Sequence, residues 1–114
     1  MNKLFIFSTG LMLALATMTT YAAGNAAEGE KKAKAICAAC HGVDGSAPSD
    51  QFPRIGGQYE SYIKQALHEY KNGDRKNAIM APQAAQLSDQ DIDNVAAWFS
   101  QQNGKLHVLN YSSK

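Results

Sequence analysis

Apolar and small residues recur at helical spacing near the start of the chain. They follow one another at steps of three and four, which places them on one narrow face of a helix predicted over about residues 25–38. The residues on this face are Ala26, Gly29, Ala33, Ile36 and Cys40. Because most of them are small, the pattern predicts that a second helix approaches this face closely.

Two later stretches show the same helical period. The spacing predicts a helix over residues 59–72 that ends at Gly73, and a last helix that begins after Ser88, with Asp91 in capping position, and ends before Gly104. Their predicted buried faces consist of Tyr59, Tyr62, Ile63, Ala66, Leu67 and Tyr70, and of Ile92, Val95, Ala96 and Phe99, with Trp98 beside them. No strand pattern is convincing before the last ten residues. The expected fold is all-α, with about three main helices and long connections.

The segment between the first two helices has the composition of a loop. Six of its residues favour turns: Gly42, Gly45, Pro48, Pro53, Gly56 and Gly57. A connection longer than ~12 residues is uncommon in a small domain and is usually functional or disordered. Because residues 42–58 directly follow a pair of cysteines, we expect this loop to wrap around a bound group.

The N-terminus has the pattern of a signal peptide. A short basic start precedes an apolar segment over residues 4–16, and small residues suited to cleavage follow at 20–22. The apolar segment is shorter than the ~20 residues that span a bilayer. We therefore expect a cleaved leader over residues 1–23 rather than a stable membrane anchor, with export to the periplasm. The rest should form one domain over residues 24–104 and a tail over 105–114.

Charge narrows the range of partners. The chain of 114 residues has 11 basic and 10 acidic side chains, a formal net charge of +1, and loss of Lys3 with the leader would bring the balance to zero. This balance argues against nucleic acid or another polyanion as a partner. A domain of this size buries a modest core and often needs a covalent or cofactor support.

The two cysteines lie in the segment Cys37-Ala38-Ala39-Cys40-His41. Cys-x-x-Cys-His is the attachment sequence of c-type haem, in which both thiols bond to the porphyrin and the histidine ligates the iron. Helical spacing puts both cysteines on one face, so that they reach neighbouring edges of one macrocycle. A thioredoxin-like dithiol is a weaker alternative, because it needs a βαβ context. A zinc site made of Cys37, Cys40, His41 and one further histidine, His68 or His107, is also chemically permissible. Its tetrahedral geometry would be strained, because Cys40 and His41 are neighbours in the sequence.

The second axial ligand of such a haem decides between an electron carrier and a protein with an open iron. Met80 is the only methionine outside the leader, and it lies in a predicted loop that Pro82 stiffens. We expect Met80 to be this ligand. The competing candidates are His68, predicted to face solvent, and His107, in the tail.

These residues resemble the class I c-type cytochromes, in particular the small bacterial single-haem cytochromes of the c-553 type and one half of the two-haem periplasmic cytochromes c. The likeness runs from Gly29 to Phe99. Its pieces are Gly29 with residues 37–42, then residues 52–58, 75–82 and 95–99. The resemblance implies the class I cytochrome c fold, with long loops wrapped around one covalently attached haem c.

The resemblance also implies particular contacts. The Pro53 carbonyl is expected to hold the ring N–H of His41 and so to orient this ligand, and the first and last helices are expected to cross at Gly29. Many relatives carry an aromatic residue at the position of Ala33, so Trp98 or Phe99 must fill that space. The polar residues that flank the ligand segments, each more easily read as solvated, are Arg54, Gln58, Arg75 and Asn77.

The expected function is periplasmic one-electron transfer without enzymatic activity, by a monomer with His41 and Met80 as the axial ligands. The expected partners are redox proteins: a quinol-oxidising complex or dehydrogenase as donor, and a terminal oxidase or reductase as acceptor. A haem subunit of a periplasmic dehydrogenase is the alternative. A peroxidase or gas-binding cytochrome is a third possibility, which requires an open iron.

Overall fold

A computed structural model describes residues 23–103, and within this range the protein is helical and contains no strand. The helices are α1 (Ala26–Lys32), α2 (Ala38–His41), α3 (Glu60–Asn72), α4 (Met80–Ala85) and α5 (Asp89–Ser100), with a π-helical turn, η1 (Ala33–Cys37), between α1 and α2. The predicted all-α fold is confirmed. Residues 1–22 and 104–114, which include nearly all of the predicted leader, the predicted tail and His107, lie outside the described residues.

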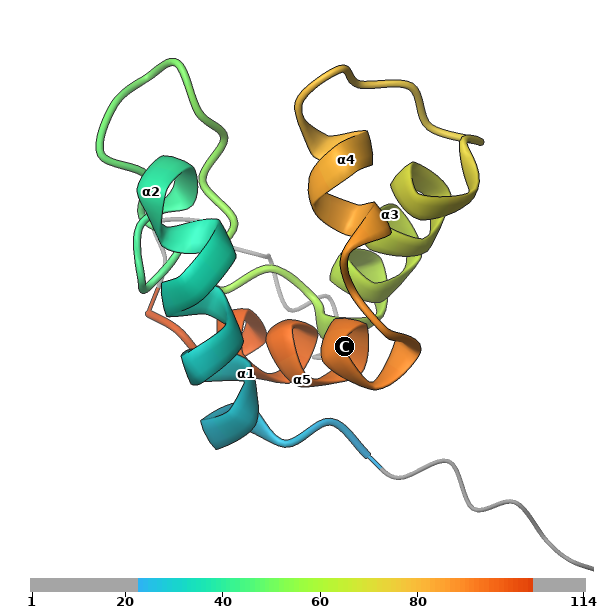
Figure 1. The fold of residues 1–114 in the computed structure, drawn as a ribbon. Coiled ribbons are helices and arrows are strands. Elements are labelled where there is room, and N and C mark those ends of the chain that lie inside the picture. Colours follow the sequence, from blue (N-terminus) through green and yellow to red (C-terminus); the bar gives the residue numbers. More distant parts are fainter. Residues whose placement is uncertain (1–22, 104–114) are drawn as a thin grey trace, which may run out of the picture.

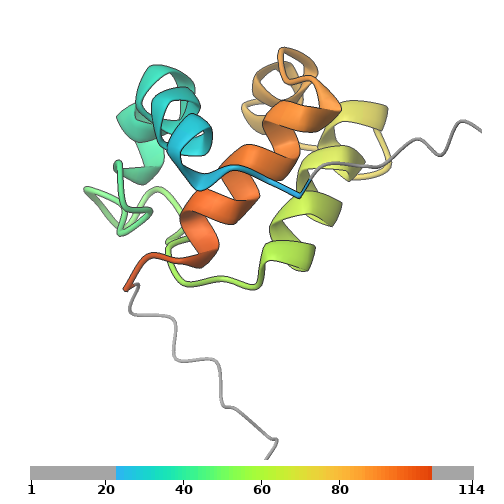
Figure 2. The same cartoon turned by 90° about the horizontal axis from the view of Figure 1, so that it is seen from below.

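The last helix carries the rest of the domain. In Figure 1, α1 and α2 rise on one side of the molecule, α3 and α4 rise on the other, and α5 runs beneath both. Seen from below, α5 lies between α1 and α3 (Figure 2), and its main contacts are with these two helices. The two halves of the domain are therefore joined through α5.

Helix α1 crosses α5 at Gly29, as the family resemblance implies. A Cβ atom added to Gly29 would lie 1.9 Å from the backbone oxygen of Asn94 and 2.9 Å from Cβ of Trp98. Only a residue without a side chain permits this approach. The start of α1 is fixed beside the same crossing, because the Asn25 side chain caps the N–H groups of Ala27 and Glu28.

The core forms where the three long helical segments meet. Its buried residues are Ala33, Ile63, Val95, Ala96 and Phe99, with Cys37, Ile55, Leu67 and Trp98 packed against them. Phe99 is only 2% exposed and lies in the cluster that contains Ala33. Phe99 and Trp98 of α5 therefore pack in the same cluster as the small Ala33, where an aromatic residue of α5 was expected to fill the space.

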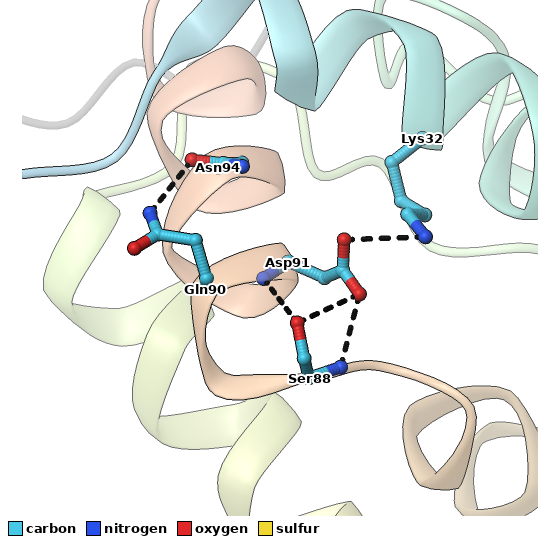
Figure 3. A network of polar contacts seen from close by, with 5 residues as sticks. All are labelled: Lys32, Ser88, Gln90, Asp91 and Asn94. Atoms are coloured by element: carbon cyan, nitrogen blue, oxygen red, sulfur yellow. Dashed lines mark hydrogen bonds and ion pairs between the residues drawn. The ribbon is translucent and has the colours of Figure 1, made fainter.

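Polar contacts fix the N-terminal half of α5 (Figure 3). The predicted cap is confirmed as a capping box, in which the Asp91 N–H donates to Ser88 Oγ and the Ser88 N–H donates to Asp91 Oδ2, each at 3.0 Å. Lys32 of α1 forms an ion pair with Asp91 at 3.2 Å. Asn94 is 9% exposed, and its Oδ1 accepts from the Asn25 N–H at 2.8 Å and from Gln90 at 3.0 Å.

The first helical region differs from the sequence prediction. It continues to His41 instead of ending near Ala38, and it passes through η1, where the Ala38 N–H donates to the Ala33 carbonyl five residues earlier. A π turn inserts one extra residue into the helical register and often occurs at functional sites. This extra residue changes which side chains after Cys37 lie on the same helix face as the side chains before Ala33.

The segment before α5 also differs. Met80 was expected in a loop, but it is the first residue of the short helix α4. The α-helical geometry over six residues includes Pro82, which is tolerated in a first turn because the missing N–H has no helical partner there. Among the described residues, no helix is both long and apolar enough to cross a membrane.

Candidate functional site

Two adjoining cavities, of about 250 and 280 Å³, lie between the halves of the domain. They share part of their lining, and the shared residues come from η1, α2, the loop that follows α2, α3, α4 and the α4–α5 connection. These residues are Cys37, His41, Pro53, Leu67, Tyr70, Met80 and Leu87. The structure thus brings both ends of the predicted haem site to one place.

His41 is held in one orientation. Its side chain is 7% exposed, and its Nδ1 lies 2.8 Å from the Pro53 carbonyl oxygen. Since a carbonyl can only accept, Nδ1 carries the proton, and the lone pair of Nε2 is left for a metal. The hydrogen bond expected from the family resemblance is present. It fixes the tautomer that an iron ligand requires.

The loop over residues 42–58 places the Pro53 carbonyl through its own backbone contacts. Gly42 ends α2 with a positive φ of 78°. The Gly45 carbonyl then accepts from the N–H groups of Ile55 at 2.8 Å and Gly56 at 3.0 Å. A Cβ on Gly45 would lie 2.4 Å from the Gly56 nitrogen, so this pairing requires glycine. The predicted wrapping loop is therefore closed on itself around Pro53.

Both cysteines are free thiols beside the cavities, Cys37 lining both and Cys40 the second. Burial raises the pKa of the Cys37 thiol to about 11. A redox-active dithiol depends on a lowered thiol pKa, so this environment does not suit the thioredoxin-like alternative. Among residues 23–103, no group of three or more His, Cys, Asp or Glu side chains is placed to hold a metal ion.

Met80 lines both cavities from the side opposite α2, and its backbone is fixed. Asn77 Oδ1 accepts from the N–H groups of Ile79 and Met80, each at 2.9 Å. The competing ligand His68 is exposed, as predicted. Asn77 is exposed, as expected, and its side chain also organises the start of α4.

Other lining residues were only partly anticipated. Tyr62 and Ile63, both predicted on a buried helix face, line the first cavity, but only Ile63 is buried and Tyr62 is 49% exposed. Tyr59, predicted on the same face, is 52% exposed and lines neither cavity. The polar residues Arg54, Gln58 and Arg75 are at the first cavity. Leu87, which is 4% exposed, was missed. It directly precedes the Ser88 cap, where an apolar residue often staples a helix start, and that signal could have found it.

The donor set fits a covalently held haem. Two thiols, one imidazole with a fixed Nδ1 proton and one thioether surround cavities whose lining is otherwise mostly aliphatic and aromatic. Thiols bond covalently to haem in the Cys-x-x-Cys-His motif, and imidazole and thioether are axial ligands of iron. Among the described residues, every buried side-chain nitrogen or oxygen atom has a hydrogen-bond partner, so no unpaired polar group conflicts with a haem in these cavities.

This helical fold, built around a Cys-x-x-Cys-His segment at an apolar cavity, is that of the class I c-type cytochromes. A sequence model of the family described as cytochrome c matches residues 26–103, and the chain belongs to this family. Membership implies covalently bound haem c and a role in electron transfer.

Relatives with known sequences agree. The chain is 44% identical over 103 residues to cytochrome c4 of Pseudomonas aeruginosa, covering 90% of this chain and 49% of that protein. It is 42% identical over 83 residues to cytochrome c-554(548) of Halomonas halodenitrificans, covering 70% of this chain and 99% of that protein.

A solved structure shows the same fold. The crystal structure of reduced recombinant cytochrome c4 from Pseudomonas stutzeri superposes with a TM-score of 0.67 at 42% identity, over 72% of this chain and 47% of that one. The chain thus spans about half the length of the cytochrome c4 relatives it matches.

Proposed function

We propose that the protein is a one-electron carrier with a single haem c, attached through Cys37 and Cys40 and ligated axially by His41 and Met80. The observation that carries this proposal is that His41 of α2 and Met80 of α4, helices on different sides of the domain (Figure 1), both line the same two cavities, as Cys37 does. The haem would supply the one-electron change between ferrous and ferric iron. With His41 and Met80 as its ligands from the protein, the iron would have no open position for a substrate.

The chain's own residues set the conditions for this transfer. The Pro53 carbonyl holds the Nδ1 proton of His41 and raises the basicity of Nε2. The thioether of Met80 favours the ferrous state relative to a second histidine. The apolar lining from Leu67, Leu87 and their neighbours excludes water and acts in the same direction.

The cellular setting is part of the proposal. The leader pattern over residues 1–23 supports export to the periplasm with cleavage of the signal peptide. A soluble monomer would then shuttle electrons from a quinol-oxidising complex or dehydrogenase to a terminal oxidase or reductase. The single Cys-x-x-Cys-His segment of the sequence supports the single-haem assignment.

A haem subunit of a dehydrogenase is the second candidate. The chain is 37% identical over 71 residues to a protein of Chlorobaculum tepidum named the cytochrome subunit of sulfide dehydrogenase. A stable subunit would co-purify with a catalytic chain at fixed stoichiometry. A shuttle would purify alone and exchange electrons with its partner on collision.

The test is the visible spectrum of protein exported together with the haem-attachment machinery. We expect a c-type reduced spectrum and, in the ferric protein, the weak far-red band of a sulfur–iron bond. Met80→Ala should keep the haem, lose this band and bind carbon monoxide when reduced. The matched control is Ile79→Ala, because Ile79 is adjacent and also lines the second cavity but has no group that binds iron. A far-red band that survives in Met80→Ala would refute ligation by Met80.

A further inference from the structure

The segment between α3 and α4 delivers Met80 to the cavity, and it has few contacts of its own. Of residues 73–79, Arg75 is the single one that is not exposed. Gly73 leaves α3 in the left-handed region with φ 88°, and nothing lies within 4 Å of where its Cβ would be. A segment with so little burial is expected to open locally at low free-energy cost.

Arg75 folds back onto α3. Its Nη1 donates to the Tyr62 hydroxyl at 3.3 Å, and its guanidinium carbon lies 4.9 Å from the centre of the Tyr70 ring. The latter distance is within the range of a cation–π interaction. The Arg75 N–H donates to the Glu69 carbonyl at 3.0 Å. Main chain and side chain of one residue thus tie the segment to three positions on α3.

This anchoring residue is also part of the site. Arg75, Tyr62 and Tyr70 all line the first cavity, which Met80 lines as well. Met80 follows Arg75 by five positions, and between them Asn77 orients the start of α4 through its contacts with the N–H groups of Ile79 and Met80. If Arg75 left α3, the four exposed residues between it and Met80 would lose their anchor, and the start of α4 that carries the thioether would be free to move with them.

We propose that Arg75 is a positioning residue for Met80: by clamping the 73–79 segment to Tyr62 and Tyr70 of α3, it keeps the Met80 sulfur in place in the cavity. This inference rests on the proposed ligation of haem iron by Met80. The planar guanidinium suits this role, because it lies over the Tyr70 ring and at the same time donates a hydrogen bond to the Tyr62 hydroxyl.

The test compares Arg75→Gln with Lys76→Gln in the haem-loaded protein. Both remove one positive charge from neighbouring positions, but Lys76 is exposed and has no side-chain hydrogen bond or ion pair within residues 23–103. The probe is cyanide binding to the ferric protein, since cyanide can bind only when the sulfur has left the iron. We expect Arg75→Gln to bind cyanide roughly tenfold faster, the effect of losing one hydrogen bond and one cation–π contact. Lys76→Gln should keep the parent rate.

Further measurements separate a clamp from an effect of charge. The far-red band of Arg75→Gln should fade on heating below the temperature at which its helices unfold. Tyr62→Phe, which removes only the hydroxyl, should give a smaller rise in the cyanide rate and reports on the clamp even where Arg75→Gln does not mature. Equal shifts of the reduction potential in Arg75→Gln and Lys76→Gln, with parent cyanide rates in both, would overturn the clamp.

The proposed function and this inference fail in different ways. A parent protein without a far-red band would refute the ligation by Met80, and with it the premise of the clamp. A parent protein with the band, together with Arg75→Gln and Tyr62→Phe variants that bind cyanide at the parent rate, would refute the clamp alone.

Discussion

Replacement of Gly29 by alanine tests the helix crossing that supports the site, because two physical effects predict opposite signs. Gly29 lies inside α1 with helical geometry. On helix propensity alone, Gly29→Ala would stabilise the protein by about 0.5–1 kcal/mol. Its new methyl group, however, would lie 1.9 Å from the Asn94 backbone oxygen, where ordinary contacts begin at 3.4 Å.

The steric effect should win. The clash is with main chain, which has no rotamer to change, so α1 and α5 would have to separate by about 1.5 Å at this point. Overpacking of this kind costs about 1–3 kcal/mol. Subtracting the propensity gain leaves a net loss of about 0–2.5 kcal/mol. Because the contact is with main chain, we expect the upper part of this range, about 1–2 kcal/mol. In a domain of this size that lowers the melting temperature by about 5–15 °C.

The assay is thermal unfolding of the ferrous haem-loaded protein, followed by circular dichroism. Ala27→Gly is the control, because Ala27 is exposed on the same helix and reports the propensity term without the contact. It should lower the melting temperature by only a few degrees. A Gly29→Ala protein as stable as the parent, or more stable, would show that the close approach of α1 to α5 is absent.

Three other substitutions test separate parts of the molecule. Cys37→Ala combined with Cys40→Ala should abolish covalent haem, measured as haem that an acidic organic solvent extracts from the denatured protein. Burial acts to raise the Asp91 pKa, but hydrogen bonds from Ser88 and Lys32 outweigh it and hold the pKa below its usual value of 3.8. A carboxylate with a lowered pKa stabilises the folded protein fully above about pH 4, and this stabilisation is lost as the pH falls through the pKa of the folded state. Asp91→Asn should therefore lower the free energy of unfolding by about 1 kcal/mol at pH 7 and by progressively less below about pH 4, measured by urea unfolding at both pH values. Trp98→Phe removes the 2.8 Å hydrogen bond from Trp98 Nε1 to the Val43 carbonyl and should cost about 1 kcal/mol in urea unfolding, with the far-red band unchanged.

The parts of the fold that the sequence predicts are those with a local signal. Ser88 and Asp91 form a capping box whose four-residue pattern is complete in the sequence. Gly73 ends α3 in the left-handed conformation that glycine favours. The face of small residues predicts the close approach of another helix, and the family resemblance adds that the last helix crosses it at Gly29.

The missed features depend on contacts between distant residues or on a shift of register. The π turn η1 covers only five residues, which is too few to show a period of its own. Their spacing in the sequence fits a continuous α-helix as well as a helix with one inserted residue. Helix α4 is too short for a periodic signal. The position of Arg75 over Tyr70 depends on how the chain returns after Gly73, which no spacing along the sequence encodes.

The two walls of the site come from different halves of the domain, and this bears on the proposed bond between the iron and Met80. His41 and the two cysteines belong to the half made by α1, η1, α2 and the loop over 42–58, whereas Met80 belongs to the half made by α3 and α4. The main contacts between the halves pass through α5, which packs on α1 at one end of the path and on α3 at the other. A bond between the iron and Met80 would close this path into a ring. Weakening either contact of α5 should therefore loosen the bond from Met80, the ligand on the sparsely buried segment, while His41 stays fixed by Pro53 within its own half.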